Sequence, residues 1–240
     1  MSTRTTSRPP LTRVRVFDLE TTGIDTENAR IVTGFIGDVI DDGEGGVTVE
    51  NDMDLLVNPG IEIPARAIEV HGITTEHAAA HGIDPGVAAT LLAASIADPV
   101  RAGIPMVGFN APSDFTLLDR ELRRNGRPPL NMDGALVVDP LVLDKAFDKF
   151  RRGKRTLEAS TKYYGIRLDD AHTARADSVA TGRLALLLAR HPLFAGRPQD
   201  SVTELQAGWY ASQACEFQLH KRRTEPDFVA PQKWPMRAFG

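Results

Sequence analysis

The sequence predicts an α/β protein, with a mixed sheet of five strands flanked by helices. Three β-rich segments joined by short turns come first, at residues 13–18, 31–40 and 47–57, which is typical of an antiparallel meander. Two short apolar segments at 104–109 and 136–138 then alternate with helical patterns, which favours strands that join the same sheet through helices. With 240 residues and 42% hydrophobic content, the chain can build one large domain, or a domain with an appendage.

Helical patterns occupy most of the remaining chain. We expect helices near residues 65–70, 75–80, 85–97, 112–125, 141–150, 157–164, 174–189 and 202–223. The last of these has an imperfect apolar stripe that includes Trp209 and Phe217. It either packs back on the domain, as most helical stripes do, or forms an oligomer or partner surface. The expected organisation is a disordered lead-in over 1–12, a main domain over 13–192, and a C-terminal helix and tail over 193–240.

Composition limits the classes of protein. The first ten residues lack the apolar stretch of a secretory signal, and no apolar run approaches the ~18 residues of a membrane helix. The single cysteine, Cys215, cannot form an internal disulfide, so we expect a reducing, cytoplasmic location and no membrane partner. The net charge of −4 argues against a protein that coats DNA, but an enzyme that binds only a strand end needs only a local basic patch.

Asp18 and Glu20 form the first candidate site. Residues i and i+2 of a strand point to the same side, so both carboxylates leave one face of the segment at 13–18 near its end. Two like charges this close raise each other's pKa unless a cation lies between them. An exposed loop edge is the alternative interpretation, because such pairs are common.

Two more acids begin predicted helices on faces that are otherwise apolar. Asp177 shares its face with Ala180, Thr181, Leu184 and Leu188, and Asp114 shares its face with Leu117, Leu118 and Leu122. A carboxylate on a buried face is costly unless it is compensated, and a metal ion would compensate it. For Asp114, a helix-capping role is the alternative. A site built from four carboxylates favours magnesium or manganese over zinc.

His172 precedes the helix that carries Asp177. A side chain that titrates near neutral pH is suited to take a proton from water, although an ordinary exposed loop histidine is the alternative. A basic cluster lies upstream and could contact phosphates: Lys145, Lys149, Arg151, Arg152, Lys154 and Arg155. A second group is better interpreted as a solvated charged face: Arg120, Arg123, Arg124 and Arg127.

Taken in order, the segments Val16–Gly23, Gly108–Asp114 and Ala171–Asp177 resemble the three motifs of the DEDDh 3′–5′ exonuclease superfamily, in particular its epsilon-type proofreading members. The resemblance implies a ribonuclease-H-like fold and two Mg²⁺ or Mn²⁺ ions held by Asp18, Glu20, Asp114 and Asp177. It also implies that His172 is the general base of a two-metal hydrolysis. The expected partners are a nucleic-acid 3′ end and a possible DNA polymerase; the oligomeric state is left open.

The same resemblance implies contacts with the substrate. Thr21, Thr22 and Gly23 would lie beside the terminal nucleotide, and Leu19 would pack against its base. Further contacts are expected from His71, Ile73, Asn110, Lys154 and Arg155. Phe109 and Ser113 depart from the residues that many relatives have there, which puts substrate preference in doubt. The expected function is metal-dependent 3′–5′ hydrolysis of DNA ends; the alternatives are hydrolysis of RNA ends and a catalytically silent polymerase subunit.

Overall fold

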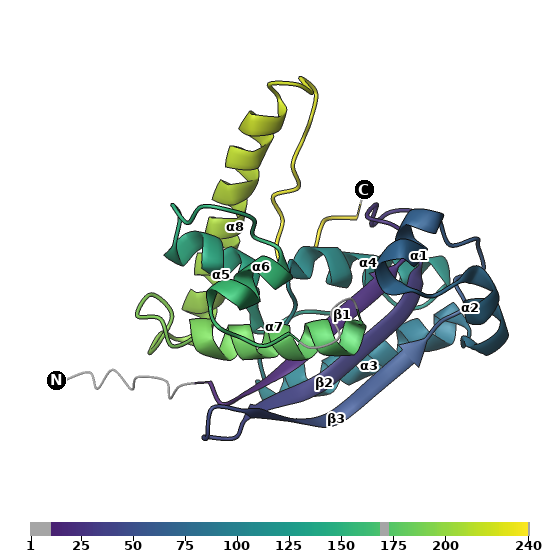
Figure 1. The fold of residues 1–240 in the computed structure, drawn as a ribbon, viewed down its shortest axis with the longest axis horizontal. Coiled ribbons are helices and arrows are strands. Elements are labelled where there is room, and N and C mark those ends of the chain that lie inside the picture. Colours follow the sequence, from purple (N-terminus) through teal and green to yellow (C-terminus); the bar gives the residue numbers. More distant parts are fainter. Residues whose placement is uncertain (1–10, 169–172, 240) are drawn as a thin grey trace.

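The computed structural model describes residues 11–168 and 173–239, and its centre is one five-stranded sheet (Figure 1). The strands are β1 (Arg13–Thr21), β2 (Ile31–Asp41), β3 (Val47–Leu56), β4 (Met106–Val107) and β5 (Val137–Val138). They lie in the order β3-β2-β1-β4-β5. The β1/β2 and β2/β3 pairs are antiparallel, whereas β1/β4 and β4/β5 are parallel. The predicted fold class is therefore confirmed.

Helices fill the connections and cover both faces of this sheet (Figure 1). They are α1 (Ala65–His71), α2 (Thr75–His81), α3 (Pro85–Ala102), α4 (Ala111–Arg124), α5 (Pro140–Phe147), α6 (Leu157–Tyr163), α7 (Ala174–Leu188) and α8 (Gln199–Lys221). The strand expected at 104–109 is reduced to Met106–Val107, because the chain turns tightly at Gly108 to enter α4. A Cβ at Gly108 would lie 3.3 Å from the Cα of Ala111.

Alternating residues of β1 enter two different apolar cores. Phe17 packs with Leu92 of α3 and Leu118 of α4 on one face, and Val16 packs with Leu184 of α7 on the other. This alternation follows from the period of two in a strand. Leu11 also packs into the second core, at 8% exposure, so the predicted disordered lead-in is wrong there; residues 1–10 lie outside the described part.

Helix α7 lies unusually close to the sheet. A Cβ added to Gly182 would lie 2.8 Å from Cγ1 of Val16 and 2.9 Å from Cβ of Val39. Only a glycine permits this spacing without a shift of backbone or side chains. The close contact positions α7, whose first turn carries Asp177, against the strand that carries Asp18 and Glu20.

The C-terminal helix packs on the domain from its start to about Ala214. Val202 is 1% exposed, and the buried Gln206 donates from Nε2 to the Val137 carbonyl (2.7 Å) and accepts from the Asp139 N–H (2.9 Å). Gln213 Nε2 also donates to the Val142 carbonyl at 3.1 Å, and Ala214 is buried. Beyond Ala214, α8 projects from the body (Figure 1), and Phe217 is half exposed. The core-packing interpretation of α8 thus holds from its start to about Ala214.

After α8 the chain returns to the domain. Ala230 N–H donates to Oε1 of Gln218 at 2.9 Å, and Arg237 N–H donates to Oγ1 of Thr116 in α4, also at 2.9 Å. The tail therefore bridges α8 and α4. None of the helices in the described segments has the length and apolar character needed to cross a bilayer.

Candidate active site

The parallel strands end at one edge of the sheet, and the candidate site lies there. β4 and β5 are parallel to β1, and each is followed within a few residues by a helix, α4 or α5. In sheets of this kind, ligands bind beyond the carboxyl ends of the strands. Asp18 and Glu20 lie near the end of β1, whereas Asp114 and Asp177 lie in the first turns of α4 and α7.

These four acids interact at this edge. Burial raises the pKa of Asp18 well above its ordinary value, and the charges of Asp114, Glu20 and Asp177 raise it further. Burial and the charge of Asp177 raise the pKa of Glu20 to about 7. We call these four side chains the carboxylate cluster. The tertiary structure therefore brings together four acids whose positions range from 18 to 177 along the chain.

Asp114 is buried, with 8% exposure. Burial raises its pKa well above the ordinary value, and the charges of Asp139 and Glu20 add to this, against an opposing contribution from its own backbone N–H. The capping interpretation of Asp114 is wrong, because Asn110 occupies the N-cap position of α4 and no side-chain hydrogen bond caps that helix. The first turn of α4 thus presents a buried carboxylate to other carboxylates.

The cluster has the charge and donor atoms that a divalent cation needs. Oxygen ligands of this kind suit Mg²⁺ or Mn²⁺, and a bound cation would relieve the repulsion that raises the pKa of Asp18 and Glu20. Within the described residues, no three His, Cys, Asp or Glu side chains are already arranged to hold a metal ion. The fit of a cation to this site therefore depends on the charge and oxygen atoms of the four carboxylates. These side chains would move closer together when a cation binds. His172 lies outside the described residues.

Asp139 is a further acid beside the cluster, fully buried, and sequence reasoning missed it. It is 0% exposed and accepts hydrogen bonds from the backbone N–H groups of Asn110 (3.1 Å), Ala111 (3.0 Å), Leu141 (3.0 Å) and Val142 (3.4 Å). Burial raises its pKa to about 6, against these donors. Its position directly after β5 and before Pro140 was an available signal, because an acid followed by proline is typical of a helix start.

A hollow adjoins the cluster at Glu20. It has a volume of about 350 Å³, and its lining includes Thr21, Thr22, Gly23 and His71. We call it the Glu20 hollow. The strand β1 supplies Glu20 and Thr21, and the last residue of α1, His71, closes the other side. Four of the residues expected near a terminal nucleotide therefore lie around one cavity.

His71 and Arg66 are the polar residues of α1 that line this hollow. The Nδ1 of His71 accepts from the Ile73 N–H at 3.1 Å, which places the ring proton on Nε2, and Nε2 is buried with no hydrogen bond of acceptable geometry. Burial lowers the pKa of His71, partly offset by the nearby backbone of Thr21. A neutral ring beside the hollow, with an unpaired Nε2 donor, has the chemistry to bind an uncharged acceptor of a ligand.

Two predicted substrate contacts are not supported. Leu19 is 7% exposed and belongs to the core that α3 and α4 cover, because it points to the opposite side of β1 from its acidic neighbours. Ile73 packs against a small cluster formed by Val32, Ile63 and Ala78. Neither residue lines the Glu20 hollow. Asn110 lies instead beside a second cavity, next to Asp139.

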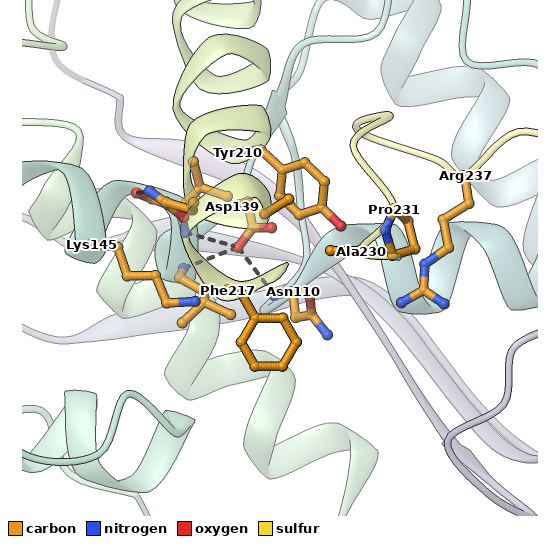
Figure 2. Close-up of a pocket in the computed structure, with 12 residues that line it drawn as sticks. Asn110, Asp139, Lys145, Tyr210, Phe217, Ala230, Pro231 and Arg237 are labelled. Atoms are coloured by element: carbon orange, nitrogen blue, oxygen red, sulfur yellow. Dashed lines mark hydrogen bonds between the residues drawn. The ribbon is translucent and has the colours of Figure 1, made fainter. Parts of the chain in front are cut away.

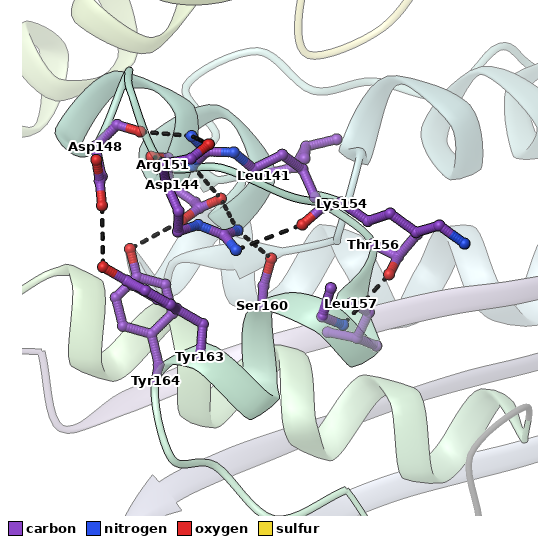
Figure 3. A network of polar contacts seen from close by, with 12 residues as sticks. Leu141, Asp144, Asp148, Arg151, Lys154, Thr156, Leu157, Ser160, Tyr163 and Tyr164 are labelled. Atoms are coloured by element: carbon purple, nitrogen blue, oxygen red, sulfur yellow. Dashed lines mark hydrogen bonds and ion pairs between the residues drawn. The ribbon is translucent and has the colours of Figure 1, made fainter.

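Two members of the predicted phosphate-binding cluster, Arg151 and Arg155, have an internal role. Asp144, which is 0% exposed, accepts from Arg151 Nη2 (2.6 Å), Arg155 Nη1 (2.9 Å) and Tyr164 Oη (2.8 Å), as Figure 3 shows in part. Arg155 also donates to the Asp148 and Arg151 carbonyls. The Arg155 guanidinium is therefore held by internal partners, and its contact with substrate stays a prediction. Lys154 is exposed and points away from this network (Figure 3).

Arg120 is the exception in the second arginine group, because Arg123, Arg124 and Arg127 are exposed as predicted. Arg120 is 4% exposed, and it donates to Asp119 (2.8 Å) and to both oxygens of Glu27 (2.7 and 2.9 Å). Its Nη2 also donates to the Ala238 carbonyl at 2.6 Å. These bonds attach the loop after β1 and the C-terminal tail to α4.

Comparisons with known proteins agree with this geometry. The RNase_T model, described as an exonuclease, matches residues 16–185. The PolC-type DNA polymerase III of Lacticaseibacillus paracasei is 27% identical over 175 residues, covering 73% of this chain and 11% of that protein. A DNA polymerase III subunit epsilon-like protein of Rhodobacter capsulatus is 32% identical over 182 residues, covering 72% of this chain and 23% of that protein. The chain thus spans less than a quarter of either relative.

Among solved structures, the zinc-ion-bound form of the E. coli ExoI–ssDNA complex superposes with a TM-score of 0.62. The two are 21% identical, and the match covers 87% of this chain and 45% of that one. At this identity the similarity establishes the fold, including the mixed sheet and its flanking helices.

Proposed function

Because this chain belongs to the RNase_T family of exonucleases, we propose that it is a metal-dependent 3′–5′ exonuclease that acts on DNA ends. The observation that carries the proposal is the carboxylate cluster, in which burial and mutual repulsion raise the pKa of Asp18 and Glu20. Perturbed acids of this kind are typical of functional sites. Four acids that converge at the edge of a sheet are costly to a protein that does not use them.

Each group has a distinct role in the proposed reaction. Asp18, Glu20, Asp114 and Asp177 would hold two divalent ions, which supply Lewis-acid stabilisation of the attacking and leaving oxygens. The Glu20 hollow would hold the terminal nucleoside, with His71 donating from Nε2. Asp139 would keep Asn110 and the start of α4 in place. His172 would accept the proton of the attacking water.

DNA is the favoured substrate because of what the relatives are. Two are named as DNA polymerase III proteins, and the solved neighbour is an ssDNA complex. We propose a polymerase partner because these two relatives are DNA polymerase III proteins. We propose a cytoplasmic location because the chain has a single cysteine. Hydrolysis of RNA ends is the alternative. RNA differs from DNA in its 2′-OH, by which a protein can distinguish the two.

The test is hydrolysis of 5′-labelled substrates by the full chain. Single-stranded DNA, duplex DNA with a mismatched 3′ end and single-stranded RNA are each incubated with Mg²⁺, Mn²⁺ or EDTA. We expect metal-dependent shortening from the 3′ end, fastest on DNA, and its loss in Asp18→Asn. The control is Asp98→Asn, because Asp98 is an exposed acid paired only with Arg101 on α3. Folded protein that shortens none of the substrates would reject the proposal.

A further inference from the structure

Two cavities between α5 and α8 join into one groove. The inner cavity, of about 200 Å³, and the outer cavity, of about 510 Å³, share three lining residues: Lys145, Gln213 and Phe217. Lys145 comes from α5, and the other two come from α8. We call the joined cavities the α5–α8 groove. It forms because α8 packs on β5 through Gln206 and on α5 through Gln213.

The inner end of the groove reaches the candidate active site. Asn110 and Asp139 line it, and Figure 2 shows Lys145 and Arg237 on opposite sides of Asp139. Asn110 occupies the N-cap position of α4, which carries Asp114 in its first turn. The charge of Asp139 in turn raises the pKa of Asp114, after the larger effect of burial, so the two carboxylates are near neighbours. The groove therefore begins at Asp139, next to the carboxylate cluster, and continues outward along α8.

Positive charges line the α5 side of the groove, and aromatic rings line the α8 side. Lys145 and Lys149 line the outer cavity from α5 and the loop after it, together with Arg151 and Arg155, whose charge Asp144 partly offsets. Glu216 is the acid on the opposite wall, and it pairs with Lys149 at 2.7 Å. The aromatic rings come from α8: Trp209 in the outer cavity, Tyr210 in the inner one, and Phe217, half exposed, in both.

Lys145 is the positive charge best placed to meet a phosphate. It lines both cavities, and within the described residues no hydrogen bond or ion pair is recorded for its ammonium group. Burial lowers its pKa, although Asp139 opposes the shift. An anion in the groove would compensate this buried charge. Arg237 contributes a second cation at the inner end, where its Nη1 donates to Oγ1 of Thr26 at 3.0 Å and its Nε is buried without a partner.

We propose that the α5–α8 groove binds the single strand of nucleic acid that leads 5′ from the reacting end, with Lys145 on a backbone phosphate and Phe217 stacked on a base. This inference rests on the proposed function and adds the route of the strand. Single-strand sites combine a basic groove with aromatic rings on which unpaired bases stack. A duplex would not expose its base faces to Phe217, and an acidic peptide would gain nothing from the stacking rings.

Binding of a 5′-labelled oligothymidylate of roughly 12 nucleotides, a length within the range of single-strand sites, tests the groove. Fluorescence anisotropy is measured with the full chain in EDTA, so that no hydrolysis occurs, over a series of salt concentrations. The variants are Lys145→Gln and Phe217→Ala. The matched controls are Lys162→Gln, at an exposed lysine of α6, and Leu219→Ala, at an exposed apolar residue of α8 outside the groove.

The two variants should differ in kind. Phe217→Ala is expected to weaken binding about tenfold with an unchanged salt dependence, because stacking is lost and no charge changes. Lys145→Gln is expected to weaken binding and to reduce the slope of log K against log salt by about 0.7, the value for one phosphate contact of a single strand. Both controls should bind as the wild type does.

Wild-type affinity in both groove variants, or no binding by the wild type, would reject the proposal that the groove binds a single strand. Hydrolysis of the same oligonucleotide by the wild type with Mg²⁺ is followed in parallel. Groove-dependent binding without hydrolysis would support the groove and reject only the proposed function. Hydrolysis accompanied by binding that ignores both substitutions would reject only the groove.

Discussion

The carboxylate of Asp139 accepts a 3.0 Å hydrogen bond from the backbone N–H of Ala111, the first residue of α4. It also caps α5, because it accepts hydrogen bonds from the backbone N–H groups of Leu141 and Val142. One side chain therefore joins the starts of two helices that follow adjacent parallel strands. Because Asp114 lies one turn into α4, the position of a candidate catalytic acid depends on a residue that would not touch the metal or the substrate.

Replacing Asp139 by alanine should lower both stability and activity. The substitution leaves four backbone donors without their acceptor, and an unsatisfied buried group costs about 1–3 kcal/mol. Urea unfolding and oligonucleotide hydrolysis measure the two effects, with Asp133→Ala, at an exposed acid in the loop before β5, as the control. If Asp139→Ala unfolds at the same urea concentration as the control, Asp139 does not hold the two helices.

The stability of the metal-free protein should fall as pH rises from about 4.5 to about 7. Burial and Asp177 raise the pKa of Glu20 from 4.5 to about 7, so in this window the folded state binds more protons than the unfolded state. The free energy of unfolding then decreases with pH. Added Mg²⁺ should stabilise the protein more at the upper end of the window, since ionised carboxylates are the ligands.

Thermal melts at several pH values, in EDTA and in Mg²⁺, follow this contribution. In EDTA, Glu20→Gln should show a weaker fall with pH than the wild type, because it removes one of the groups with a raised pKa. Identical pH profiles for the two proteins would show that Glu20 titrates normally.

Asp144→Ala should be strongly destabilising. It removes the common acceptor of Arg151 and Arg155, which are 6% and 14% exposed, and breaking a buried ion pair by removing one partner costs about 3–5 kcal/mol. Asp98→Ala, which breaks an exposed pair with Arg101, should cost less than about 1 kcal/mol. Urea unfolding compares them, and equal costs would contradict the structural role of this network.

His172→Ala should fold and bind metal but turn over about 10²- to 10⁴-fold more slowly, the usual contribution of a general base. Calorimetric metal titration and hydrolysis rates separate the two properties. His81→Ala, at an exposed histidine of α2, is the control. Hydrolysis by His172→Ala at the wild-type rate would remove this residue from the proposed mechanism.

Gly182→Ala should destabilise the protein by about 1–3 kcal/mol, the usual cost of an overpacked core, because the new methyl would meet Val16 and Val39. Gly208→Ala is the matched control in α8, since nothing lies within 4 Å of its added Cβ. That substitution should instead stabilise by up to about 1 kcal/mol through helix propensity. Thermal melts that rank the two variants the other way would contradict the close packing of α7.

Local patterns in the sequence were sufficient for the elements and for the acids. The period of two in β1 predicted that Asp18 and Glu20 leave one face, and the helical period predicted that Asp114 and Asp177 face a core. Both predictions depend only on neighbours a few positions away along the chain. The sheet class followed from the meander and the strand–helix alternation, and the family resemblance followed from three short motifs. These features are therefore determined by residues that are close together in the sequence.

The tertiary structure decided which partner each charge finds. Arg155 was predicted to bind phosphate but pairs with Asp144, and Arg120 was predicted to be solvated but pairs with Glu27. The role of Asp139 depends on the backbone N–H of Ala111, which lies 28 residues earlier in the chain. The α5–α8 groove likewise requires two helices from distant segments to pack together. Charge and period specify what a side chain can do, but only long-range packing determines which groups lie within reach of it.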